Sequence, residues 1–236
     1  MKNKILFKRI LMSLFGVIIC AISVGIFKVA ALGVDPFQSF MAGLDEIVPI
    51  KFGTLYMITN AVLLLFALIF DRHYINIATF INLFLLGYIT QFSYELFSKL
   101  LPEPAMWVRV LCLIVGIVII CFGSSFYITA DLGVSTYDAV ALIMANTWKW
   151  WKFKYIRIIT DLVCVIIGCV LFLLSGKSWK AIPTIAGIGT IVTAFFMGPL
   201  IEFFADLCAR PFLNGKTKKD KDTTGDESAD TKSIEE

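Results

Sequence analysis

The sequence predicts an all-α membrane protein with six transmembrane helices, built as two inverted three-helix repeats that each carry one short re-entrant or interfacial helix. Three observations predict this fold class: the composition, six long apolar runs, and a motif that recurs one hundred positions later. The 236 residues are 58% hydrophobic and only 17% charged, whereas a soluble domain carries about a quarter charged residues. The composition therefore excludes an ordinary soluble domain.

Six apolar runs are each long enough for a helix that crosses a bilayer, which takes roughly 20 residues. They cover residues 10–27, 52–70, 74–94, 110–130, 158–176 and 181–201. A basic start followed by an apolar run is also typical of a cleaved secretory signal. The first run has an internal counterpart in residues 110–130, so we expect it to be retained as a span.

The basic residues predict which side of the membrane each loop occupies. Lys2, Lys4, Lys8 and Arg9 precede the first run, which places the N-terminus inside by the positive-inside rule. With six spans, 15 of the 21 Lys and Arg residues fall on that same side. We therefore expect both termini to be cytoplasmic.

A Leu-Gly-Val motif ends the first run at residues 32–34 and the fourth run at residues 132–134. A capping residue follows each copy, Asp35 or Ser135, and position N3 after it carries Gln38 or Asp138, in a pattern that resembles a capping box. Each copy therefore predicts the start of a helix. The two predicted helices, residues 35–48 and 135–148, are too short to cross the membrane.

Further similarities between the halves indicate an internal duplication. Thr59-Asn60 aligns with Thr160-Asp161, and residues 83–96 align with residues 194–207. Because each half has three full spans, the second half starts on the opposite side, and the copies must be inverted. The predicted parts are a cytoplasmic N-terminus (1–9), membrane repeat 1 (10–98), a connector (99–106), membrane repeat 2 (107–208) and a cytoplasmic, largely disordered tail (209–236).

On these motifs the sequence resembles the bacterial YczE/YyaS/YitT family of integral membrane proteins, in which a Leu-Gly-Val-type motif heads a short helix in each half. The resemblance covers roughly residues 8 to 210 and is closer to the YczE branch, because the soluble C-terminal domain of YitT-type members is missing here. It implies a location in the bacterial cytoplasmic membrane. It implies little about activity.

The motif residues are the first candidates for a solute site. Glycine allows a sharp turn or a close approach to a ligand, but at this position it is also typical of a helix C-cap, the interpretation we favour. The polar residues either line a site at the facing N-termini of the two short helices or only cap them. Asp138 disfavours a bare anion, because a carboxylate already occupies the positive end of its helix. The candidates are Gly33, Asp35, Gln38, Gly133, Ser135 and Asp138.

Asp161 and its counterpart Asn60 are the candidates inside the spans. An ionisable side chain within a span is costly and marks a pathway or a partner. Arg157 lies four residues before Asp161, so a simple i,i+4 ion pair is the alternative to a functional role. Asn60 has no such partner, which favours function.

No pattern in the sequence predicts catalysis or a bound metal. The six cysteines lack CxxC spacing, His73 is the only histidine, and we find no nucleophile motif or cofactor fingerprint. We therefore expect that the protein has no enzymatic activity, binds no cofactor and has no nucleic-acid partner. The lipid bilayer and a small-molecule solute are the expected partners, and the sequence predicts no particular oligomeric state.

Two functions from different classes stay open. The first is a small-solute transporter or channel with a polar site between the two motif helices, favoured by inverted repeats with short helices at matching positions. The second is a non-transporting membrane protein that assists or regulates another membrane or biosynthetic complex, favoured by the scarcity of intramembrane charges other than Asp161.

Overall fold

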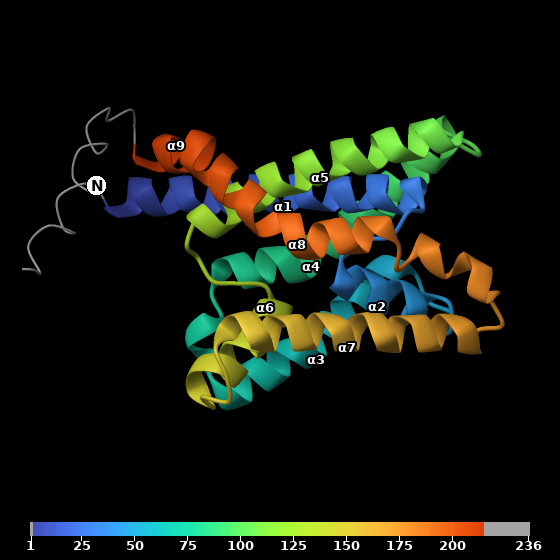
Figure 1. The fold of residues 1–236 in the computed structure, drawn as a ribbon. Coiled ribbons are helices and arrows are strands. Elements are labelled where there is room, and N and C mark those ends of the chain that lie inside the picture. Colours follow the sequence, from blue (N-terminus) through green and yellow to red (C-terminus); the bar gives the residue numbers. More distant parts are fainter. Residues whose placement is uncertain (1, 215–236) are drawn as a thin grey trace, which may run out of the picture.

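The computed structural model describes residues 2–214, and every element in that range is helical (Figure 1). The part of the predicted tail that covers residues 215–236 lies outside the described residues. The main helices are α1 (Lys2–Ala30), α2 (Pro36–Asp45), α3 (Phe52–Phe70), α4 (Ile77–Leu100), α5 (Met106–Thr129), α6 (Thr136–Leu142), α7 (Phe153–Leu174), α8 (Ile188–Phe204) and α9 (Arg210–Asn214).

Within residues 2–214, six helical segments are long and apolar enough to cross a membrane, so the predicted number of spans is confirmed there. Five of them run longer than the apolar runs, because their ends carry polar residues that still continue the helix, and Phe52–Phe70 has the same bounds as its run. The segments are Ile5–Ala30, Phe52–Phe70, Ile77–Leu100, Met106–Thr129, Tyr155–Leu174 and Trp179–Leu213.

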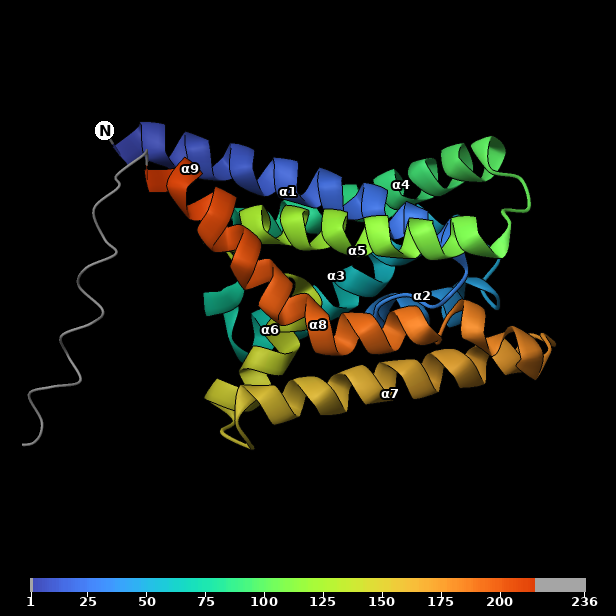
Figure 2. The ribbon, with the colours of Figure 1, turned by 45° about the horizontal axis from the view of Figure 1, so that its top comes forward.

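The spanning helices form two groups with α2 and α6 between them (Figures 1 and 2). Helix α1 packs against α4 and α5, and α5 packs against α8. On the other side, α2 packs against α7 and α6 against α3. The start of α1 and the end of α9 lie at the same end of the molecule.

The two short helices occupy the stretches that the motif predicts. Helix α2 ends at Asp45, and α6 ends at Leu142 but continues as one π-helical turn, Ile143–Thr147. About ten helical residues rise roughly 15 Å, half the thickness of the hydrocarbon core. Neither helix crosses the bilayer.

The C-terminal end stays helical through Asn214, further than the division at residue 209 suggests. A π-helical turn, Ala205–Ala209, follows α8 and leads directly into α9. Arg210 pairs with Asp206 one turn earlier and with Glu202 two turns earlier (2.6 Å for Glu202). These charge-assisted contacts stabilise the helical end.

The two halves differ in how tightly their last two spans pack. A Cβ added to Gly87 of α4 would lie 2.7 Å from the Cβ of Tyr56 in α3, so these helices are in close contact. At Gly198, the matching position in α8, an added Cβ would meet nothing within 4 Å. Helix α7 and α8 therefore lack the close contact that joins α3 to α4.

Candidate functional site

The motif glycines form sharp turns that no other residue type adopts easily. Gly33 has a φ of +99° and Gly133 a φ of +100°, in a region that only glycine enters without strain. The helix-cap role suggested by the sequence is wrong for both, because the left-handed residues next to α1 and α5 are Ala31 (φ +51°) and Asp131 (φ +50°). The glycines lie two residues later, where the chain turns back into the molecule.

Each motif turn packs onto the start of the last span of the other half. A Cβ on Gly33 would lie 2.5 Å from the backbone nitrogen of Gly187, just before α8. A Cβ on Gly133 would lie 2.8 Å from the nitrogen of Asn76, just before α4. The close approach is to protein backbone, so the glycines are required for packing.

Matching backbone hydrogen bonds hold the two turns. The amides of Gly189 and Ala78 donate to the carbonyls of Leu32 (2.8 Å) and Leu132 (2.9 Å), respectively. The amides of Val34 and Val134 donate at 3.3 Å to carbonyls at residues 185 and 74. These bonds satisfy backbone groups that would otherwise be exposed inside an apolar bundle.

The predicted caps are present at both short helices. Asp35 accepts a hydrogen bond from the Gln38 amide (3.2 Å), and the Ser135 hydroxyl accepts one from the Asp138 amide (3.1 Å). The Ser135 hydroxyl also donates to the Asp138 carboxylate (2.6 Å). Capping is therefore one role of Asp35 and Ser135.

The first turns of α2 and α6 meet through their aromatic rings. Phe37 and Tyr137 occupy equivalent motif positions, and their rings stack with centroids 4.9 Å apart at 23°. The edge of Tyr56 packs against Phe37 (5.9 Å), and the guanidinium of Arg157 lies 4.5 Å from the centre of the Tyr137 ring. The two motifs thus contact each other at residues that the sequence analysis did not single out.

A charged cluster surrounds Arg157 beside this ring stack. Its guanidinium pairs with Asp138, and its Nε lies 3.4 Å from the Asp161 carboxylate. The Tyr137 hydroxyl donates to the same oxygen of Asp161 (2.6 Å). The structure therefore joins Asp138 to Asp161 through Arg157, which extends the predicted i,i+4 pair.

Asn60 joins the two halves by hydrogen bonds. Its side-chain amide donates to the Tyr56 carbonyl (2.8 Å), and its oxygen accepts from the Thr136 hydroxyl (2.5 Å). Asn60 is 1% exposed. The sequence offered no sign of Thr136 as a partner, because the two residues lie far apart along the chain.

Two polar groups near the motifs are buried without a hydrogen-bond partner among the described residues. They are the side-chain oxygen of Gln38, a residue that is 4% exposed, and the hydroxyl of Tyr127, which is 8% exposed. Tyr127 belongs to the same core cluster as Phe37, Tyr56 and Tyr137. Such groups are costly to bury unless something binds them.

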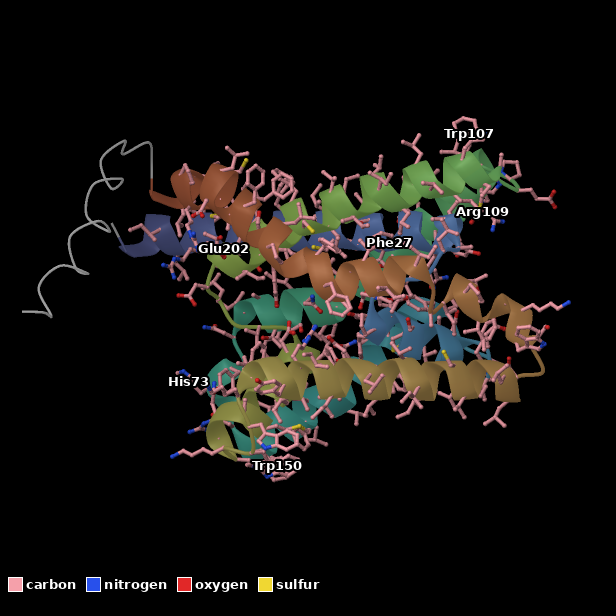
Figure 3. The ribbon with its side chains drawn as sticks, in the orientation of Figure 1. Phe27, His73, Trp107, Arg109, Trp150 and Glu202 are labelled. Carbon is pink, nitrogen blue, oxygen red and sulfur yellow. The ribbon has the colours of Figure 1, made fainter. Side chains whose placement is uncertain are left out.

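The turn after α3, which contains Asp71 and His73, supplies no side chain to the Arg157 cluster. Figure 3 shows His73 and Trp150 at the N-terminal end of the molecule and Trp107 and Arg109 at the opposite end. The Thr147 hydroxyl (2.7 Å) and the His73 amide (3.0 Å) both donate to Asp71 and lower the pKa of its carboxyl. The bond from Thr147 joins the turn after α3 to the end of the π-helical turn, Ile143–Thr147.

The hollows on the surface of the described residues include two that are apolar. One of about 200 Å³ lies between α1, α4 and α5. The other, of about 440 Å³, is lined by Met144, Trp150, Trp151, Ile156, Ile159 and Thr160. Neither is lined by a candidate site residue, and within residues 2–214 no cluster of His, Cys, Asp and Glu has the geometry of a metal site.

Comparison with known proteins gives a family and three relatives without an assigned activity. The model described as "Family of unknown function (DUF6198)" matches residues 7–206. The chain is 25% identical to the uncharacterized membrane protein YczE of Bacillus subtilis over 80% of this chain and 81% of that protein. The expected resemblance to YczE and YyaS is confirmed.

The other two relatives are similar at lower identity. An uncharacterized protein of Haemophilus influenzae is 23% identical over 86% of both chains, and YyaS of Bacillus subtilis is 21% identical over 84% of this chain and 93% of its own. No solved structure matches the sequence significantly. The membrane relative and the six apolar helices together identify a multi-pass membrane protein.

Proposed function

Because the chain belongs to the DUF6198 family, whose description assigns no function, we propose a function from the geometry: a small-solute transporter or channel with its polar site between α2 and α6. The observation that carries this proposal is the meeting of the two short helices at Phe37 and Tyr137, directly beside the cluster of Asp138, Arg157 and Asp161. Short helices that meet beside charged side chains within the membrane-spanning part are typical of transporter sites. We propose no enzymatic activity.

An inverted repeat is part of the proposal. It is supported by the nearly identical φ angles of Gly33 and Gly133 and by the matching backbone hydrogen bonds to the carbonyls of Leu32 and Leu132. The stacking of Phe37 on Tyr137, which occupy equivalent motif positions, supports it as well. On this proposal α2 and α6 are re-entrant helices that enter from opposite sides. Each packs mainly against the middle span of the other half, α2 against α7 and α6 against α3.

The orientation that we propose places the protein in the bacterial cytoplasmic membrane with both termini in the cytoplasm. Single cysteines introduced at 45 or 103 should then react with an impermeant maleimide added outside whole cells, and cysteines at 73 or 152 should not. Permeabilised cells supply the control, because all four positions should react there. Labelling of position 152 in intact cells would refute the orientation and weaken the inverted repeat.

The transport proposal is tested on full-length protein in proteoliposomes. Flux or current is recorded on solid-supported membranes while amines, monovalent metal ions, carboxylates and neutral sugars are applied in turn. We expect one solute class to give a signal that Asp161→Asn abolishes at normal insertion. Asp131→Asn is the matched control, because Asp131 lies at the exposed end of α5 and Asn tolerates its left-handed backbone.

The alternative, a protein that assists another complex without transporting, predicts a different outcome. Then no solute class gives a signal above empty liposomes, and Asp161→Asn changes only stability. That result would refute the transport proposal.

A further inference from the structure

Three carboxylates lie near the two motifs, and two of them share one ion-pairing partner among the described residues. Arg157 pairs with Asp138 and Asp161, and it is the sole basic side chain that forms an ion pair with any of these aspartates within the described residues. Asp35 caps α2 two residues before the stacked Phe37 and forms no ion pair within the described residues. With all three ionised, this region carries more negative than positive charge, which is costly inside a membrane unless a cation is present.

The two unpartnered polar groups lie in the same region and require a binding partner of a defined kind. The Gln38 oxygen is an acceptor without a donor, and the Tyr127 hydroxyl either donates or accepts. Tyr127 belongs to the same core cluster as Phe37, Tyr56 and Tyr137. A ligand with N–H groups would satisfy both.

The arrangement does not fit a bare metal ion. Calcium and magnesium take six or more oxygen ligands at short range. Residues 2–214 contain no group of three or more His, Cys, Asp or Glu side chains that could hold a metal ion. The charges are spread around aromatic rings instead. Arg157 against Tyr137 shows that a guanidinium fits one of these faces.

Resting on the transport function proposed above, we propose that the solute is a small organic cation with N–H groups, an alkylammonium or guanidinium compound. Its charge is balanced by Asp35, Asp138 and Asp161, and its N–H groups donate to the Gln38 oxygen. Phe37 and Tyr56 supply the aromatic surface in the first half, at the positions equivalent to Tyr137 and Arg157.

Binding is measured on the purified full-length protein in detergent, independently of flux. The probes are methylguanidinium, butylammonium, methylurea and tetramethylammonium, added at constant ionic strength and followed by calorimetry and thermal unfolding. Methylurea has a similar planar shape and still carries N–H groups but lacks the charge of methylguanidinium. Tetramethylammonium keeps the charge but lacks every N–H.

We expect methylguanidinium or butylammonium to bind and to raise the unfolding temperature, while methylurea and tetramethylammonium bind at least about tenfold more weakly. Gln38→Leu should weaken binding of the N–H cations by about tenfold, and Asp35→Asn should abolish it. Asp131→Asn, which changes an exposed carboxylate that pairs with Arg9 and not with Arg157, should bind like the wild type.

Two results would overturn the proposal: equal binding of methylurea, or no binding of either N–H cation to folded wild-type protein. The first would show that charge is not recognised. Flux of a neutral or anionic solute with no cation binding would refute this proposal but keep the transport function. Cation binding without any flux would refute the transport function alone.

Discussion

Replacing Arg157 should be far more damaging than replacing either carboxylate that it contacts. Arg157→Gln leaves Asp138 and Asp161 facing each other without their cation. Asp161→Asn keeps an oxygen that accepts the Tyr137 hydroxyl, and Arg157 keeps its pair with Asp138. Asp161→Asn is nearly isosteric, whereas Arg157→Gln also shortens the side chain, so a variant that removes all three charges is needed to separate charge from volume.

The magnitude follows from the burial of the cluster. Removing one partner of a fully buried pair costs about 3–5 kcal/mol. The side chains of Arg157 and Asp161 are 31% and 20% exposed, so screening reduces the cost, and we expect about 2 kcal/mol for Arg157→Gln. Asp161→Asn should cost less than about 1 kcal/mol.

The assay is the free energy of unfolding in mixed micelles, followed by circular dichroism for the single variants and for the triple variant Asp138→Asn/Arg157→Gln/Asp161→Asn. The triple variant removes all three charges and should recover most of the stability lost in Arg157→Gln. If Arg157→Gln is no worse than Asp161→Asn, or if the triple variant shows no recovery, the cluster is not held by charge as described.

Three further substitutions test packing, turn geometry and capping. Gly87→Ala should destabilise by about 1–3 kcal/mol because its methyl has no room, while thermal unfolding of Gly198→Ala should show no loss; equal losses would contradict the open packing of α8. Gly33→Ala should lower the yield of folded protein far more than Gly176→Ala, which has a similar positive φ but nothing within 4 Å, and equal yields would leave only backbone strain as the cause. Ser135→Ala should cost about 1 kcal/mol of unfolding free energy and Ser135→Asn much less, whereas an equal cost for both would argue against the cap.

The number of spans and the two capped helices could be predicted because each depends on residues close in sequence. The apolar runs define the spans, and Asp35 and Ser135 cap helices whose first turns follow directly. The π-helical turn after Leu142 left no such local signal.

The contacts that assemble the candidate site could not be predicted, because they join residues that are distant along the chain. Asn60 meets Thr136 across the two halves, and Asp138 meets Arg157 from a different helix. The repeat does provide one signal, because residues equivalent about an inversion axis can meet each other, as Phe37 and Tyr137 do. Gly33 was interpreted as a cap because the sequence alone does not reveal the backbone of Gly187 beside it.

The backbone hydrogen bonds that join each motif turn to the other half of the chain have a consequence for biogenesis. The Leu32 carbonyl and the Val34 amide are synthesised early, yet their partners, Gly189 and Ile185, emerge from the ribosome about 150 residues later. Until then these backbone groups lack their final partners in a membrane environment where unpaired groups are costly. A nascent chain that ends after α4 is thus an incomplete folding unit, and the first half matures only when the last span is inserted.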